Sequence, residues 1–212
     1  MLKSFRGTYE GTSSETEIKK SVFFCHLKMT LTVEEADAFI KEMKKEYRGY
    51  TNASAYIVGA SGEHQRARDN GEPSGTGGLP ILETLKQHDL VNMTAVVSRK
   101  WGGTLLGANR LKIAYGGACN KAIRELGLAE WRLQQEIQLL ADYPFTGLLE
   151  NEFKNQEWIQ LQEIDYGEKV IYHCSVDLED VERFIEETTD WTKGQAEYQM
   201  GEKQFLPFPI EE

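Results

Sequence analysis

The stretch that decides the fold contains two glycine clusters, Asp69 to Gly78 (DNGEPSGTGG) and Ser98 to Gly107 (SRKWGGTLLG). Each cluster directly precedes a segment with the apolar spacing of a helix. Glycine permits backbone conformations that other residues avoid, and a helix N-terminus presents unpaired N–H groups with a partial positive charge. With Arg99, Lys100 and Arg110 close by in sequence, the two clusters predict a surface that receives an anion.

The segments around these clusters predict a mixed α+β domain. Apolar spacing favours strands over residues 18–27, 53–58 and 93–97, and helices over residues 33–47, 80–88 and 109–126. Thr32 and Glu35 form a capping-box pattern at the start of the first helix, and Asn109 is expected to cap the third. The polar region 59–78 is predicted to be a long loop, and such loops in compact domains are usually functional or mobile.

The second half of the chain has a different pattern. Strands are expected over residues 136–140, 158–166, 169–176 and 196–200, and helices over residues 145–155 and 178–188. This βαββαβ order is typical of the ferredoxin-like fold. We therefore predict two domains, residues 1–130 and residues 131–212.

Charge is distributed unevenly between the two halves. Residues 1–130 carry 18 Lys and Arg against 15 Asp and Glu, whereas residues 131–212 carry 6 against 19. The acidic half would repel a phosphate backbone, and the first half can carry a local basic patch. The chain has no apolar run long enough to span a membrane and begins without the apolar stretch of a signal peptide, so a cytoplasmic protein with no membrane partner is expected.

Residues that support catalysis or metal binding are sparse. The three cysteines, Cys25, Cys119 and Cys174, form no C-x-x-C pair, which argues against a disulfide framework or structural zinc. No H-E-x-x-H or G-x-S-x-G motif is present. We expect no metal and no bound cofactor.

Several side chains near the clusters allow two interpretations. Ser74 and Thr76 are favoured as turn residues that satisfy local backbone groups, although their hydroxyls can also donate to a ligand. Asp69, Glu63 and Glu72 are more often solvated or paired than ligands of Mg²⁺. Arg99 suits bidentate anion recognition but can equally pair with Asp69 or Glu72.

Trp101 is the remaining ambiguous side chain. It can stack on a base, but burial in the core is the favoured interpretation.

The two clusters resemble the signatures of the YigZ/IMPACT family, in the strings Asp69 to Leu82 and Val96 to Gly107 followed by Ala114 and Tyr115. The resemblance covers residues 18–126, and the acidic half is similar to the smaller domain of bacterial members. It implies a first domain similar to the second domain of a small-subunit ribosomal protein, and a ferredoxin-like second domain similar to the last domain of elongation factor G. Both relatives act at RNA or the ribosome, and the eukaryotic branch of the family regulates translation through protein contacts.

The leading hypothesis is a non-enzymatic binding protein linked to translation, which binds RNA, the ribosome or a nucleotide phosphate. Its expected anion-binding residues are Asp69, Gly71, Glu72, Ser74, Gly75, Thr76, Gly77, Arg99, Trp101, Gly102, Gly103 and Arg110. One alternative is a hydrolase of phosphoester or peptide bonds that uses the loop Gly71 to Gly78. Another is a protein-interaction module whose acidic domain binds a basic protein partner.

Overall fold

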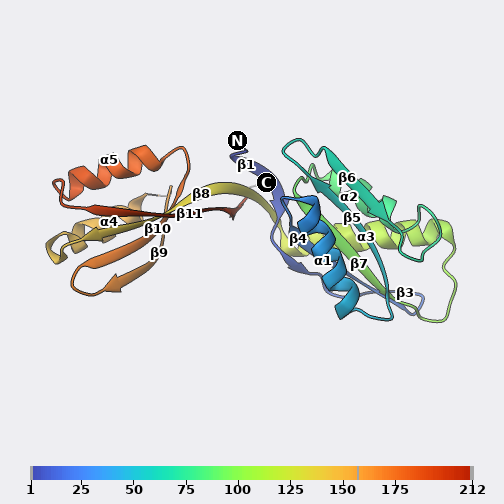
Figure 1. Ribbon diagram of the computed structural model, residues 1–212. Helices are drawn as coiled ribbons and strands as arrows, with labels where there is room; N and C mark the ends of the chain where they lie inside the picture. Colours follow the sequence, from blue (N-terminus) through green and yellow to red (C-terminus); the bar gives the residue numbers. More distant parts are fainter. Residues whose placement is uncertain (1, 157, 211–212) are drawn as a thin grey trace. The chain divides into compact units, whose positions relative to one another are not determined.

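The computed structural model describes residues 2–156 and 158–210, which form two compact units (Figure 1). The first unit comprises Phe5–Trp131 together with residues 207–210. The second comprises the described residues of Arg132–Leu206 together with residues 2–4. Each unit therefore takes a short segment from the opposite end of the chain.

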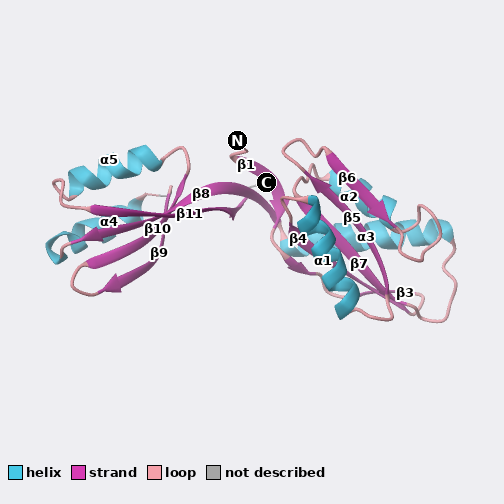
Figure 2. Cartoon of the chain, in the orientation of Figure 1, coloured by secondary structure: helices cyan, strands magenta, loops and turns pink. Residues whose placement is uncertain are grey.

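The first unit is a sheet covered by helices on both faces. Its elements are β1 (Ser4–Thr8), β2 (Gly11–Thr12), β3 (Thr16–Ile18), β4 (Ser21–Met29), α1 (Val33–Glu46), β5 (Thr51–Val58), β6 (His64–Arg68), α2 (Gly78–Gln87), β7 (Met93–Lys100) and α3 (Ala108–Leu126). Antiparallel pairing gives the strand order β2-β4-β7-β5-β6, with β3 also on β4 (Figure 2). Helix α1 packs on one face, and α2 with α3 on the other. The predicted α+β class is confirmed.

Helix α1 begins as the capping-box pattern predicts. The Thr32 hydroxyl accepts the N–H of Glu35 at 3.1 Å, and the Glu35 carboxylate accepts the N–H of Leu31 at 2.7 Å. These bonds satisfy donors that have no partner within the helix. Its buried residues, Ala36, Phe39, Ile40 and Met43, follow the predicted apolar stripe.

Two local predictions for the first unit were wrong. Helix α3 is capped by Gly107 rather than Asn109, because the chain enters the helix with a φ of 79° that favours glycine. The region 59–78 is not all loop, since β6 forms within it. Pairing with β5, from Ser54↔Arg68 to Val58↔His64, supplies the hydrogen bonds that stabilise this polar edge strand.

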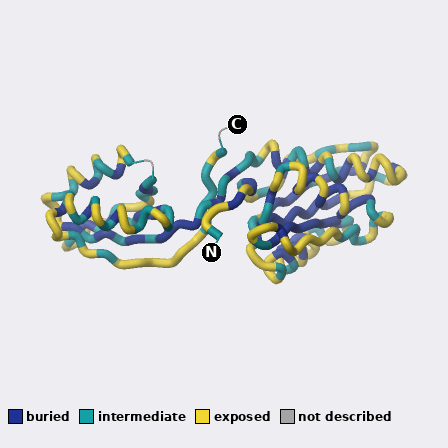
Figure 3. The backbone as a smooth tube through the Cα atoms, turned by 90° about the horizontal axis from the view of Figure 1, so that it is seen from above, coloured by how far each residue is buried: buried dark blue, intermediate teal, exposed yellow. Residues whose placement is uncertain are grey.

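The second unit has the predicted ferredoxin-like topology. Its elements are β8 (Leu128–Ala141), the 3-10 helix η1 (Tyr143–Phe145), α4 (Thr146–Asn155), β9 (Ile159–Tyr166), β10 (Val170–Asp177), α5 (Val181–Trp191) and β11 (Glu197–Pro209). The strand order is β9-β10-β8-β11, and β8 also pairs with β1. Leu149 and Phe153 of α4 and Phe184 of α5 pack on one sheet face, in a common core with Ile137 and Tyr172. Figure 3 colours the buried residues of this unit dark blue along the backbone.

Candidate nucleic-acid interface

The first glycine cluster wraps around the side chain of Asp69. Its carboxylate accepts the N–H groups of Gly75 at 2.8 Å, Gly77 at 2.9 Å and Gly78 at 3.0 Å. Desolvation raises the pKa of Asp69, but these donors outweigh it and hold the pKa below its ordinary value. A carboxylate of the chain itself therefore occupies the N-terminus of α2.

A buried ion pair connects the two glycine clusters. Arg99 Nη1 lies 2.8 Å from Glu72 Oε1, and both side chains are largely buried. The Tyr115 hydroxyl donates to the same oxygen at 2.8 Å, and Arg99 Nη2 donates to Ser21 Oγ at 3.2 Å. Of the two interpretations of Arg99, pairing with an acidic residue is therefore the one observed, and Glu72 neutralises its charge.

The remaining polar groups of the first cluster are arranged for turn formation. Thr76 Oγ1 donates to the Pro73 carbonyl at 2.6 Å, while Ser74 and Gly71 are exposed. Among the described residues, no group of three or more His, Cys, Asp or Glu side chains is placed to hold a metal ion. Asp69 and Glu72 of this loop are also engaged, Asp69 with backbone N–H groups and Glu72 with Arg99.

The second glycine cluster exposes Trp101. The prediction that this side chain lies in the core was wrong: it is 62% exposed. Strand β7 ends at Lys100, and at Gly102 the chain passes so close to the neighbouring hairpin that a Cβ atom would lie 2.0 Å from the Lys20 carbonyl oxygen. The Gly102 N–H also donates to Ser21 Oγ at 3.3 Å. This contact fixes the point at which Trp101 leaves the sheet.

The neighbouring hairpin is itself unusual. Ile18 pairs with Ser21, so Lys19 and Lys20 form a two-residue turn, with φ values of 48° and 67°. Such turns normally contain Asn and Gly, because a side chain in the left-handed region costs energy. Both lysines are exposed. Strain of this kind often marks functional segments.

A basic and apolar surface results at this end of the first unit, where Figure 1 shows the β3–β4 turn and the β7–α3 loop side by side. We define the Trp101 face as Trp101 with the exposed cations Lys19, Lys20, Lys100 and Arg110. Within residues 2–156 and 158–210, none of these four cations forms an ion pair.

Apolar side chains and glycines accompany these cations. Leu105 and Ile113, in the same loop and in α3, are 86% and 72% exposed. Gly103, with a φ of 81°, is exposed in the loop. Interaction sites are marked by contiguous exposed apolar patches with a polar rim, and Leu105 and Ile113 supply exposed apolar surface near these cations in sequence.

Lys19 and Lys20 were not among the residues predicted to bind an anion. Two consecutive lysines at the start of the predicted strand 18–27 were the available signal.

A buried polar chain crosses the sheet on the side of α1. Asn52 Nδ2 donates to two backbone carbonyls, so its Oδ1 accepts the Ser98 hydroxyl at 2.6 Å. Ser98 Oγ therefore accepts from His26 Nε2 at 3.2 Å, and His26 Nδ1 accepts the Thr12 hydroxyl at 2.9 Å. Burial lowers the pKa of His26 to about 4, so the imidazole is neutral. This arrangement stabilises the sheet and is closed to a ligand.

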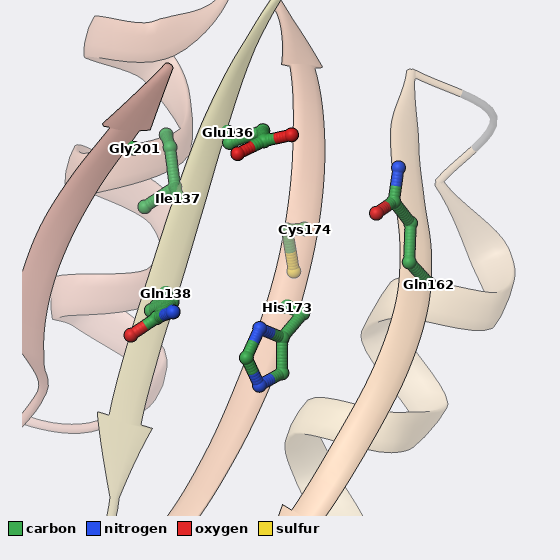
Figure 4. Close-up of a pocket in the computed structure, with 7 residues that line it drawn as sticks. All are labelled: Glu136, Ile137, Gln138, Gln162, His173, Cys174 and Gly201. Atoms are coloured by element: carbon green, nitrogen blue, oxygen red, sulfur yellow. The ribbon is translucent and has the colours of Figure 1, made fainter.

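The second unit contains a shallow hollow of about 190 Å³ on its sheet (Figure 4). Three of the polar side chains that line it bind neighbouring side chains. Glu136 accepts from Gln204 at 2.6 Å, Gln162 donates to Ser175 at 2.8 Å, and His173 Nε2 lies 2.9 Å from Asp165. Glu136, Gln162 and His173 are therefore already engaged within the second unit.

Comparison with known proteins adds independent information. Residues 19–123 match the model of the Impact N-terminal domain, and residues 139–195 match a domain of unknown function, DUF1949. The chain is 38% identical over 207 residues to the IMPACT family member YvyE of Bacillus subtilis (strain 168), covering 97% of this chain and 95% of the relative. It is 34% identical over 188 residues to the IMPACT family member YigZ of Escherichia coli (strain K12), covering 84% and 88%.

A solved structure agrees with these similarities. A crystal structure described as that of a hypothetical protein aligns over the whole of both chains, with 29% identity and a TM-score of 0.60. Within the described part of the chain, no helix is both long and apolar enough to cross a bilayer.

Proposed function

Because the chain belongs to the IMPACT family, we propose that it is a non-enzymatic RNA-binding protein linked to translation, and that it binds through the Trp101 face. The observation that carries the proposal is the 62% exposure of Trp101 among four cations that form no ion pair within the described chain. Every base has a face on which an indole ring can stack, and unpaired lysine and arginine side chains neutralise phosphates.

The contacts of the two glycine clusters favour binding over hydrolysis. Asp69 occupies the N–H groups at the start of α2, and Glu72 neutralises Arg99. Near the two glycine clusters, the cations without an ion pair in the described chain are therefore those of the Trp101 face, whereas Arg99 is paired. The proposal accordingly moves the predicted anion-binding surface towards Trp101, Gly102, Gly103 and Arg110.

Salt dependence provides the test. Full-length protein is titrated into labelled transfer RNA and a labelled single-stranded RNA by fluorescence anisotropy at several salt concentrations. Replacing Lys100 and Arg110 by alanine should reduce the slope of log affinity against log salt by about 1.5, since each lost phosphate contact contributes roughly 0.7–0.9. Trp101→Ala should weaken binding to single-stranded RNA by about 1–3 kcal/mol at every salt concentration.

A matched control distinguishes the loss of cations on the Trp101 face from the loss of any two positive charges. Lys41 and Lys45 are exposed on α1 of the same unit, and their double alanine variant removes an equal charge. We expect it to bind RNA nearly as wild type does. Equal losses in the two double variants, or no RNA binding at low salt, would refute the proposal and point to a protein partner for the Trp101 face.

A further inference from the structure

A second interaction surface lies at one end of the second unit, where two tyrosine rings are exposed. Tyr143 of η1 is 51% exposed, and Tyr166, the last residue of β9, is 62% exposed. Leu148 of α4 is also exposed. Large aromatic rings are enriched at the energetic centres of protein interfaces, so two on one surface are notable.

Both rings are held in place through their hydroxyl groups. The Tyr143 hydroxyl donates to the Gly167 carbonyl at 2.8 Å, which connects η1 to the turn between β9 and β10. The Tyr166 hydroxyl donates to Glu150 Oε1 at 3.1 Å, which connects β9 to α4. With the polar ends of the rings engaged, the ring faces and edges remain for a partner. Fixed rings lose little conformational entropy on binding.

Acidic side chains surround the two rings. Asp142 precedes η1, Glu150 accepts from Tyr166, and Glu168 lies in the β9–β10 turn. The nearby cation Lys169 is paired with Glu197. Over residues 132–206 the sequence contains 6 Lys and Arg against 17 Asp and Glu, a net charge of −11. This excess repels nucleic acid and attracts a basic protein segment.

We propose that the surface formed by Tyr143, Tyr166, Asp142, Glu150 and Glu168 binds an arginine-rich segment of a partner protein. Arginine fits better than lysine, because a guanidinium group stacks on an aromatic face and also forms a two-pronged contact with a carboxylate. The same unit already contains such a stack, with Arg183 4.3 Å from the ring centroid of Trp158. This surface is independent of the Trp101 face, so failure of either proposal leaves the other standing.

The test uses full-length protein and two labelled peptides, one alternating Gly with Arg and the other alternating Gly with Lys. Binding is measured by fluorescence anisotropy at physiological salt. We expect the Arg peptide to bind more tightly than the Lys peptide. Replacing Tyr143 and Tyr166 by alanine should weaken Arg-peptide binding roughly tenfold or more, as expected for residues at the centre of an interface.

Two further variants make the outcome specific. Tyr143→Phe/Tyr166→Phe keeps the rings, so it should bind the Arg peptide more tightly than the alanine variant if the rings are the binding groups. Glu182→Gln/Glu186→Gln removes two exposed charges on α5 and should change affinity less than about twofold, because salt screens distant charges.

Three results would overturn the proposal. The first is equal weakening by the alanine and α5 variants. The second is equal affinity for the two peptides. The third is binding of a labelled RNA that the alanine variant loses, because the surface would then be a nucleic-acid site.

Discussion

The buried imidazole of His26 should make the stability of the first unit strongly pH-dependent. The pKa of His26 in the folded chain is about 4, because burial disfavours the charged form, against an ordinary value of 6.5. The unfolded chain therefore binds a proton at a higher pH than the folded chain does. The stability that neutral His26 provides is complete above about pH 6.5 and falls as the pH drops towards 4. The full loss corresponds to about 3 kcal/mol.

The variant His26→Gln isolates this contribution. Carboxylates elsewhere also affect acid stability, but they are common to both proteins, so the difference between wild type and variant reports His26. Urea unfolding should show the stability advantage of wild type over His26→Gln shrinking by about 2 kcal/mol between pH 7 and pH 5. An NMR titration of the imidazole should find it neutral throughout this range.

The control is His64→Gln, which removes an exposed imidazole and should track wild type at each pH. A constant difference between wild type and His26→Gln from pH 7 to pH 5 would refute the reasoning. So would an NMR midpoint near 6.5 for His26. Either result would mean that the hydrogen-bonded side chains of Thr12, His26, Ser98 and Asn52 open to solvent on a short timescale.

Three further predictions concern the two glycine clusters and are measured by urea unfolding. Asp69→Ala leaves three backbone N–H groups without their acceptor and should cost about 2–3 kcal/mol, whereas a cost below about 0.5 kcal/mol would mean that water replaces the carboxylate. Arg99→Met leaves Glu72 buried without its cation and should lower the free energy of unfolding by about 3–5 kcal/mol. The double variant Arg99→Met/Glu72→Gln should recover part of this loss, and no recovery would contradict the pairing of Arg99 with Glu72. Gly102→Ala places a Cβ against the Lys20 carbonyl and should displace the turn, weakening RNA binding as well as stability; unchanged RNA affinity would separate the turn from the interface.

The sequence predicted the elements whose signals are local. The capping box of Thr32 and Glu35 and the stripe from Ala36 to Met43 both depend on spacing within one helix, and both are confirmed. The βαββαβ order of the second unit likewise follows from successive periodic segments. Strand β6 was missed because its residues, HQRAR, are polar and exposed, and only the adjacent β5 makes them a strand.

The site was harder to predict because its chemistry depends on tertiary contacts. Glu72 and Arg99 are distant in sequence, so only the fold shows that they pair, with Tyr115 as a third partner. Trp101 follows a strand of buried residues, and burial in the core was the favoured interpretation of this side chain. The close approach of Gly102 to the Lys20 backbone directs the chain outward, and this contact between residues distant in sequence cannot be predicted from a local pattern.

The exchange of terminal segments between the two units affects how the chain folds during synthesis. The first unit, Phe5–Trp131, leaves the ribosome early but includes residues 207–210, which emerge only after the second unit. At about 5–20 residues per second, the interval between residues 131 and 207 lasts roughly 4 to 15 s. A nascent first unit must therefore persist in an incomplete form while the second unit is made, and a fragment ending at residue 130 would remain in that form permanently.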